Sequence, residues 1–473
     1  MVKISRQHLL PADCLNQDIM IRIIHPNETI QKICGAQKTR ENLNYTDARH
    51  SLNVPDADGI LLFQTLTGEL LLLTEEEWNA RMKDEDIRRK LIESRFLVPT
   101  DFDERVYADE IERILSMFVK KPERLSNYTI FTTLDCNARC FYCYELGARR
   151  DKMEKKTAEE AASFIIRNSK GGPVRLAWFG GEPLMNSAVI DTISKSLKNH
   201  GISYTARMVS NGYFFDGELV RRAKDQWNLK KIQITLDGTE EIYNRTKAYV
   251  DQGANAYRRV MRNIALLLDA GIRVRIRLNM NSKNALDLNC LTEELAGRFA
   301  GKTGLNVYVA LLHQYGSHSV GAFSDEHTAL EEHRALTEKI HALGLRDEGV
   351  LHNRIKNNYC MADSDENVMI LPDGRIGKCE HELEADLIGT VSNDALDAHG
   401  IRVWKELLKG ESCNTCPLYP RCRILKRCAR YAEGCSEMDR QIIKERLIRV
   451  IINTYENINS GKKPNAEEDS EFC

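Results

Sequence analysis

Apolar and polar residues alternate in regular blocks between residues 127 and 311. Longer stretches with helical periodicity separate short apolar runs, and one of these stretches opens with TAEE at residues 157–160, which is typical of a helix capping box. The apolar runs are rich in β-formers and occupy residues 127–134, 174–179, 204–209, 231–236, 272–279 and 305–311. This alternation predicts an α/β fold in which a parallel sheet is covered by helices, and six units favour an open, partial (β/α)6 barrel.

The pattern before residue 122 predicts a small N-terminal domain. Residues 1–55 show little periodicity, whereas residues 59–74 contain two apolar runs around a Gly68 turn and predict a β-hairpin. Helical stretches follow at residues 75–83 and 85–98, and residues 103–120 predict an amphipathic linker helix. A hairpin followed by helices is winged-helix-like; the domain either recognises a peptide or merely caps the barrel.

Composition narrows the function classes. The chain has 473 residues and a net charge of −2, so it offers no basic field for nucleic acid. No apolar run approaches the length of a membrane span, and the first residues lack the apolar core of a signal peptide. We therefore expect a cytoplasmic protein.

The fourteen cysteines are unevenly distributed along the chain. Ten lie in two groups, at residues 136–143 and 360–435, and the other four are scattered. In a long chain without a secretion signal, grouped cysteines indicate metal ligands rather than disulfides. The first group, Cys136, Cys140 and Cys143, places three thiols in one short loop. Three thiolates can hold a cubane iron-sulfur cluster and leave its fourth iron open; a structural zinc knuckle is the alternative.

The spacing CxxxCxxC, with aromatic Tyr142 before the last cysteine, resembles the signature of the radical S-adenosylmethionine (SAM) superfamily. The resemblance implies a 4Fe-4S cluster that binds SAM, whose reductive cleavage yields a 5'-deoxyadenosyl radical. Further motifs stand where the predicted strands end, which is the working edge of such barrels. The family match makes these residues candidate SAM contacts: Tyr142, Gly180, Gly181, Glu182, Pro183, Ser210, Asn211, Arg277 and Asn279. For Arg277 a structural salt bridge is the alternative, and Arg245 is a competing partner of the SAM carboxylate.

The second cysteine group resembles the SPASM extension, which binds two auxiliary 4Fe-4S clusters. By that resemblance the first auxiliary cluster takes Cys360, Cys379 and Cys428, and the second takes Cys413, Cys416, Cys422 and Cys435. The chain departs from the family pattern where Lys426 stands two residues before Cys428. Seven ligands leave one iron open, and a substrate thiolate would suit it. Zinc ribbons are the alternative for this region.

Six histidines lie between residues 312 and 358, and their spacing fits no metal-ligand set. We expect them to be solvated or linker residues, with His313 alone near the site.

These features lead to a functional hypothesis. The chain is expected to be a radical SAM peptide maturase that joins a Cys sulfur to a carbon of another residue in a ribosomally made precursor peptide with a leader. Anaerobic sulfatase maturation, with Glu380 as base, and carbon-carbon crosslinking are enzymatic alternatives; a zinc-dependent scaffold is the non-enzymatic one. A flavodoxin or ferredoxin would donate electrons.

The expected domain order follows the motifs. Residues 1–122 form the N-terminal domain, 123–312 the barrel, 313–358 a bridging segment, 359–440 the auxiliary-cluster domain, and 441–473 a C-terminal helix with a disordered tail.

Overall fold

The structure is a computed structural model. It describes residues 21–25, 43–118, 122–145, 147, 149–251, 255–312, 323, 325–346, 349–351, 360–384 and 386–461. None of the helices in these ranges is long and apolar enough to cross a membrane.

Six parallel strands form the centre of the molecule. Their order in the sheet follows the chain, from β7 at one side to β12 at the other. They are β7 (Asn127–Thr133), β8 (Val174–Gly180), β9 (Tyr204–Ser210), β10 (Leu229–Leu236), β11 (Arg273–Met280) and β12 (Leu305–Leu311). The predicted strands are thus confirmed to within two residues, because buried parallel strands appear in sequence as short, continuous apolar runs.

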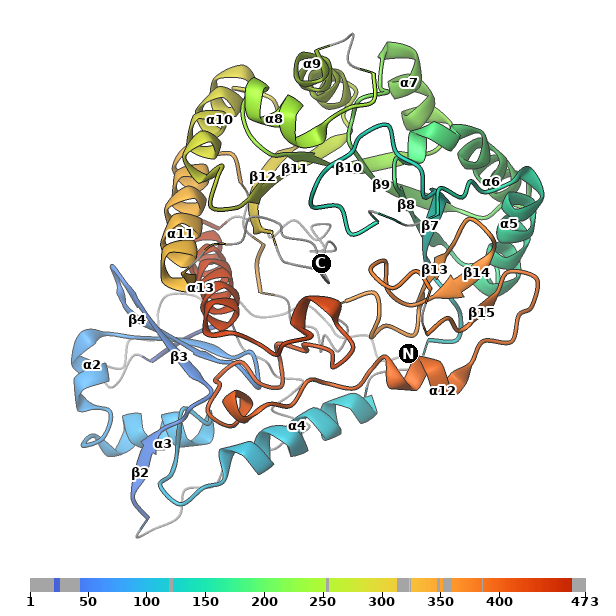
Figure 1. The fold of residues 1–473 in the computed structure, drawn as a ribbon. Coiled ribbons are helices and arrows are strands. Elements are labelled where there is room, and N and C mark those ends of the chain that lie inside the picture. Colours follow the sequence, from blue (N-terminus) through green and yellow to red (C-terminus); the bar gives the residue numbers. More distant parts are fainter. Residues whose placement is uncertain are drawn as a thin grey trace.

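Helices cover one face of this sheet (Figure 1). They are α5 (Lys155–Ser169), α6 (Ser187–Asn199), α7 (Gly217–Asp225), α8 (Glu240–Lys247), α9 (Ala256–Asp269), α10 (Ala285–Arg298) and α11 (Glu326–Ala342). Alternate strand residues such as Trp178, Met208, Ile234 and Ile276 are fully buried against them in one core. The residues between these positions therefore face the concave side of the arc.

The sheet continues beyond β7 instead of closing into a barrel. Strand β13 (Asn367–Ile370) pairs in parallel with β7, and β14 (Arg375–Gly377) and β15 (Gly389–Thr390) extend it in antiparallel fashion. The nine-stranded sheet is curved rather than flat (Figure 1). The predicted partial barrel is confirmed, and the cysteine-rich region, residues 360–435, is joined to it edge to edge.

The N-terminal domain contains the predicted hairpin, β4 (Gly59–Gln64) and β5 (Leu70–Leu73), within a larger sheet of order β1-β5-β4-β3. Strands β1 (Arg22–His25), β2 (Tyr45–Asp47) and β3 (Ser51–Asp56) lie in the stretch where the sequence shows little periodicity. Helices α2 (Glu75–Ala80) and α3 (Glu85–Glu93) follow the hairpin, and the predicted linker helix is α4 (Glu104–Phe118). One sheet face packs on α3, and the other packs on the cysteine-rich region.

Two helix predictions are wrong in detail. Residues 85–98 are not one helix: α3 ends at Glu93, and β6 (Leu97–Pro99) pairs with β2. Arg95 between them has a φ of 62°, so the chain reverses there. Thr157 does not cap α5, which begins two residues earlier after Glu154 and has no side-chain cap.

The segment between the barrel and the cysteine-rich region is more than a bridge. Helix α11 packs its Leu336 and Ile340 into the barrel core, and its His333 is buried, contrary to the expected solvated role. Burial lowers the pKa of His333 to about 4. His313, His318 and His352 lie outside the described residues.

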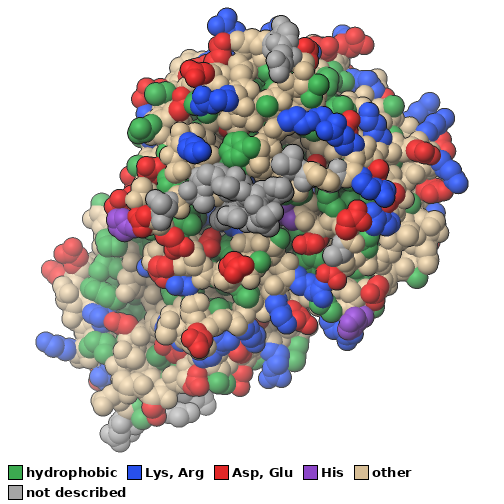
Figure 2. All heavy atoms as spheres, viewed as in Figure 1, with side chains coloured by type: hydrophobic (Ala, Val, Ile, Leu, Met, Phe, Trp, Pro, Cys, Tyr) green, Lys and Arg blue, Asp and Glu red, His purple; other side chains and the backbone are tan. Residues whose placement is uncertain are grey.

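The C-terminal helix begins earlier than expected. After α12 (Ala398–Val403) and the cysteine-rich loops, α13 (Glu437–Asn459) starts four residues before the predicted boundary, because Ser436 and Asp439 form a capping box. The predicted disordered tail lies outside the described residues. On the face drawn in Figure 2, side chains of both charges are interspersed, in keeping with the near-zero net charge.

Candidate active site

The three cysteines of the first group lie on the loop that follows β7, at the carboxyl edge of the parallel sheet. Backbone bonds hold this loop on two sides. Glu182 N donates to Asp135 O at 2.9 Å on the β8 side, and Arg139 N donates to Lys247 O at 2.8 Å on the α8 side. The loop is therefore a fixed part of the edge where β/α barrels bind their ligands.

The three thiols are close enough to influence one another. Burial, reinforced by the Glu182 carboxylate and the two neighbouring thiols, raises the pKa of Cys136 to about 12. Burial likewise raises the pKa of Cys143 to about 12. Backbone Ala138 N donates to Cys136 Sγ at 3.4 Å, and Asn211 Nδ2 donates to the same sulfur at 3.8 Å.

This donor set fits an iron-sulfur cluster. Three thiolates from one loop can bind three irons of a cubane and leave its fourth iron open. N–H donors to a ligand sulfur are also the contacts that tune such clusters. Cys136, Cys140 and Cys143 are the residues that would hold one here.

The two glycines of the predicted SAM loop allow the backbone after β8 to pack closely against the backbone after β7. Gly180 has a φ of +116°, and a Cβ added there would lie 2.1 Å from Thr133 O. A Cβ on Gly181 would lie 2.4 Å from Asp135 O. Since no side chain fits at either place, these glycines let the end of β8 approach the cysteine loop.

The carboxylate of Glu182 joins two of the predicted motifs. Its oxygens accept hydrogen bonds from Ser210 Oγ at 2.9 and 3.0 Å, from Asn211 N at 2.8 Å and from Leu184 N at 3.1 Å. Burial raises the pKa of Glu182 to about 7 even though these bonds lower it. Pro183 follows within the first turn of a short 3-10 helix. Residues 180–183 and 210–211 thus form one structural unit beside the cysteines.

Tyr142 belongs to a buried polar group that the sequence did not reveal. Its hydroxyl donates to Asp237 Oδ2 at 3.0 Å and accepts from Lys247 Nζ at 2.8 Å. Lys247 and Asp237 are both buried, and the positive Lys247 opposes the burial that raises the pKa of Cys140. This places one cation next to the thiols.

Arg277 and Asn279 lie on the concave side of β11, where Arg277 Nε donates to Asn279 Oδ1 at 2.8 Å. Arg277 also contributes, after burial, to lowering the pKa of His381. His381 packs edge-on against Tyr144 with ring centroids 4.5 Å apart. The competing Arg245 is exposed on α8 and pairs with Glu241 at 3.5 Å. Arg277 is therefore the arginine of the two that lies near the cysteine loop.

Cys360, Cys379 and Cys428 meet in a small apolar cluster with Ala362, Trp404 and Leu425. Cys360 and Cys428 both raise the pKa of Cys379, after burial and Glu380. Glu380, the predicted base, also helps to raise the pKa of Tyr144, after burial and Glu145. Tyr144 directly follows Cys143 in the chain. This second group of thiols thus faces the first group across Tyr144.

The remaining four thiols line one small pocket. Cys413, Cys416, Cys422 and Cys435 converge there with apolar side chains and Arg440. Arg440 comes from α13 and donates to Cys435 O at 3.0 Å. The grouping of the seven cysteines into three and four is the one expected from the sequence, and four thiols around one apolar pocket fit a complete cluster ligand set.

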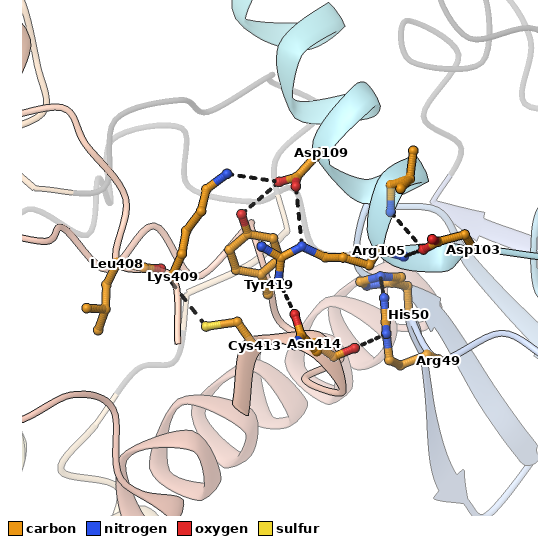
Figure 3. A network of polar contacts seen from close by, with 11 residues as sticks. Arg49, His50, Asp103, Arg105, Asp109, Leu408, Lys409, Cys413, Asn414 and Tyr419 are labelled. Atoms are coloured by element: carbon orange, nitrogen blue, oxygen red, sulfur yellow. Dashed lines mark hydrogen bonds and ion pairs between the residues drawn. The ribbon is translucent and has the colours of Figure 1, made fainter. Parts of the chain in front are cut away.

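Helix α4 packs against the loop that carries Cys413 and Tyr419 (Figure 3). Tyr419 donates to Asp109 Oδ1 at 2.7 Å, and the guanidinium of Arg105 lies 3.9 Å from the Tyr419 ring centroid. Arg105 Nη1 also donates to Asn414 Oδ1 at 3.3 Å, between the first two cysteines of the set. Helix α4, predicted as a linker, therefore contacts Tyr419, which lines the pocket of these thiols.

Sequence reasoning missed several residues of the site. Lys247, Glu145 and His381 are the main ones; burial raises the pKa of Glu145, beside Tyr144, to about 7. Neither Lys247, at the end of a polar helix, nor His381 matches a local pattern. Asp237 could have been found from the sequence, because it directly follows a predicted strand at the edge of the sheet where such barrels bind their ligands.

Comparison with known proteins agrees with this geometry. A model of the radical SAM superfamily matches residues 130–282, which run from β7 past the end of β11. The chain therefore contains a radical SAM domain, the domain that defines this superfamily of enzymes. The superfamily implies a 4Fe-4S cluster and SAM. The three cysteines of the loop after β7 would be the protein ligands of the cluster.

Among curated relatives, a probable GTP 3',8-cyclase of Methanococcus aeolicus is 27% identical over 169 residues, or 35% of this chain and 54% of the relative. The chain thus spans about half the length of that protein. Among solved structures, anSMEcpe with bound AdoMet has a TM-score of 0.55 at 16% identity, over 70% of this chain and 99% of that one. A second structure of it, with AdoMet and Cp18Cys peptide, has a TM-score of 0.53 at 15% identity, over 71% of this chain and all of that one.

Proposed function

We propose that this protein is a radical SAM peptide maturase that installs a thioether between a Cys sulfur and a carbon of another residue in a ribosomally made precursor peptide. One observation carries the proposal: the cysteine-rich region divides into a set of four thiols and a set of three. Two auxiliary clusters on these sets would leave one iron open in the three-thiol set. A substrate thiolate is the soft ligand that suits it.

The cofactors would supply the difficult chemistry. When bound, SAM and the first cluster provide a 5'-deoxyadenosyl radical that takes one hydrogen atom from a substrate carbon. Forming the C–S bond removes one C–H and one S–H bond, so the thiol proton needs a base and one electron needs an acceptor. Glu380, next to Cys379, is our candidate for the base, and the auxiliary clusters are our candidates for the acceptor.

Two features support a peptide substrate. The structure of anSMEcpe with Cp18Cys peptide shows that a protein of this fold can hold SAM and a peptide together. In addition, β3 is an edge strand of the N-terminal sheet and pairs only with β4 among the described strands. An edge strand can accept an extended leader peptide as a further strand.

Formylglycine formation from Cys or Ser is a second candidate. The carboxylate of Glu380 directly after a cluster cysteine favours it, and that reaction would not require an open auxiliary iron. Carbon-carbon crosslinking would differ from a thioether in leaving the substrate thiol intact. The curated cyclase relatives match over about half their length, so their nucleotide chemistry is not carried over.

The first test is anaerobic reconstitution followed by iron and sulfide counting. We expect about twelve irons in the wild type and about eight in the triple variant Cys136→Ala/Cys140→Ala/Cys143→Ala. SAM cleavage, with flavodoxin or ferredoxin as donor, should occur only in the wild type. Zinc in place of iron, or cleavage that survives the triple substitution, would overturn the proposal.

The second test identifies the product. A Cys-containing precursor encoded beside this chain should lose the mass of two hydrogens. One of its thiols should also stop reacting with an alkylating reagent. Loss of two hydrogens with the thiol still alkylatable would favour the carbon-carbon product, and an aldehyde-reactive product would favour formylglycine. Cys290→Ala, which removes an exposed cysteine outside all three sets, is the matched control and should leave the product unchanged.

A further inference from the structure

Of the three thiols in its set, Cys360 lies farthest along the chain from a described helix or strand. Cys379 stands two residues after β14, and Cys428 directly precedes the short 3-10 helix Ala429–Tyr431. Cys360 lies in a turn that precedes β13 by several residues. Cubane clusters ordinarily take four thiolates, so a set of three has no spare ligand. Whatever fixes the backbone at Cys360 therefore decides whether this set can hold a cluster.

Asp363 fixes the turn that contains Cys360. Its Oδ1 accepts a hydrogen bond from Cys360 N at 3.3 Å, and its side chain is completely buried. Its other oxygen, Oδ2, accepts a hydrogen bond from Arg423 Nε at 3.1 Å. One carboxylate therefore connects the backbone of Cys360 to an arginine that lies 60 residues beyond Asp363 in the chain.

Arg423 belongs to the loop of the other cysteine set. It directly follows Cys422 and has a φ of 49°, a left-handed conformation that is uncommon for an arginine. Its guanidinium pairs on two sides, with Asp363 and with Glu112 of α4. Glu112 also pairs with Arg421 at 3.5 Å. The exposed fractions of these four side chains lie between 0% and 14%. The network thus runs from the N-terminal domain through the four-thiol loop to the three-thiol set.

The chemistry of this network suits orientation better than stabilisation. Burying charged groups costs free energy, so a buried ion pair adds little net stability, although the removal of one partner is costly. A guanidinium offers its donors in a fixed planar fork, which orients the carboxylate that it contacts. Arg423 therefore sets the direction of the Asp363 carboxylate, and this carboxylate sets the position of Cys360 N.

We propose that Asp363 and Arg423 are positioning residues that hold Cys360 as a ligand of the first auxiliary cluster. This inference rests on the proposed function, because it presupposes a cluster on the three-thiol set. Through Glu112, the N-terminal domain takes part in the same arrangement. A cluster with one open iron needs all three of its thiolates in place, so a small shift of Cys360 would affect this cluster before the other one.

The test isolates the two auxiliary clusters in the full-length chain. In the triple variant Cys136→Ala/Cys140→Ala/Cys143→Ala, about eight irons should remain after reconstitution, and electron paramagnetic resonance of reduced samples should show both clusters. The further substitution Cys360→Ala defines the spectrum of the second cluster alone. Asp363→Asn in its place should remove about four irons or, where the iron stays, change only the signal that Cys360→Ala removes.

The asparagine substitution disturbs Asp363 with little change of shape. Its amide oxygen can still accept from Cys360 N, but its NH2 group then faces the donors of Arg423. Asp394→Asn is the matched control, since Asp394 forms an exposed pair with Arg167 and lies outside both cysteine sets. The control should leave the iron content and the spectrum unchanged.

A second variant checks that the two residues act through one contact. Arg423→Gln should affect the first auxiliary cluster as Asp363→Asn does. The double variant should lose no more than either single variant, because residues in direct contact do not contribute independently. An Asp363→Asn sample with the iron content and spectrum of its parent would overturn the inference. Loss of the second cluster's signal together with the first would also overturn it, since Asp363 would then support the whole region rather than Cys360.

The iron content of the parent separates this inference from the proposed function. About four irons in the triple variant, with no effect of Cys360→Ala, would refute the two auxiliary clusters and the positioning role together. About eight irons that do not depend on Asp363 would refute the positioning role alone. Dependence on Asp363 in an enzyme whose product contains no thioether would refute the proposed function and leave the positioning role standing.

Discussion

Lys247 Nζ lies 3.0 Å from Asp237 Oδ2, and both side chains are buried beside the first cysteine loop. The pair joins the end of α8 to the end of β10, and Tyr142 completes it through hydrogen bonds to both partners. Burial lowers the pKa of Lys247, but Asp237 more than offsets this effect and the pKa lies well above its ordinary value. The ammonium group therefore keeps its charge. A fixed cation thus stands next to Cys140, where it favours thiolates.

Lys247→Met should destabilise the protein and weaken its hold on the first cluster. Removing one partner of a buried ion pair leaves an unpaired charge, which costs about 3–5 kcal/mol. We expect this loss in urea unfolding, together with about four fewer irons after reconstitution. The double variant Lys247→Met/Asp237→Leu should be less destabilised than the single one, since no buried charge remains. Lys156→Met is the exposed control, and an equal loss there would contradict the argument.

Gly180→Ala should distort the cysteine loop. The added Cβ would lie 2.1 Å from Thr133 O, and the φ of +116° is unfavourable for alanine. We expect a loss of at least about 2 kcal/mol in the free energy of unfolding and a lower SAM affinity, measured by calorimetry. The control is Gly297→Ala in α10, whose added Cβ meets no atom within 4 Å and should stabilise the helix by about 1 kcal/mol. Normal stability and SAM binding of Gly180→Ala would disprove this role.

Glu182→Gln should separate the two motifs that Glu182 joins. The carboxylate accepts hydrogen bonds from three donors, Ser210 Oγ, Asn211 N and Leu184 N, whereas an amide turns its NH2 group toward some of them. A buried mismatch of this kind costs about 1–3 kcal/mol, which thermal unfolding would detect. Glu159→Gln, at an exposed pair on α5, should change stability by less than about 0.5 kcal/mol. Equal effects of the two substitutions would show that Glu182 has no special structural role.

Acid should loosen the contact between the N-terminal domain and the cysteine-rich region through His50. Its Nδ1 donates to Pro417 O at 3.1 Å, and burial lowers its pKa to about 4. Because the unfolded chain binds the proton more readily, this contribution is intact above about pH 6.5 and is lost as the pH falls toward 4. From pH 7.5 to 5.0 it amounts to about 2 kcal/mol.

The measurement for His50 is urea unfolding at both pH values. Wild type should lose about 2 kcal/mol more than His50→Gln over that interval. His399→Gln, at an exposed position in α12, serves as the control and should follow wild type. A pH dependence of His50→Gln identical to that of wild type would show that other groups dominate.

The strands of the barrel could be predicted from local pattern, because buried parallel strands are short apolar runs. The division of the seven later cysteines into three and four followed from the resemblance to the SPASM extension. The edge strand β3 and the short β6 were missed because three to six residues with a proline among them give no clear period. Strand β6 pairs with β2, which is distant in sequence, so a tertiary contact defines it, whereas β3 pairs with β4, which follows it directly.

The sequence by itself determined which residues could carry chemistry: three thiols in one loop, seven more near the C-terminus, and glycines and polar residues at strand ends. Only the tertiary structure decided how they combine. It joined β13 to β7, packed α4 against Tyr419 and buried Lys247 against Asp237. These relationships bring together side chains from distant parts of the chain. Their energies come from burial and charge in the folded state, which no local pattern records.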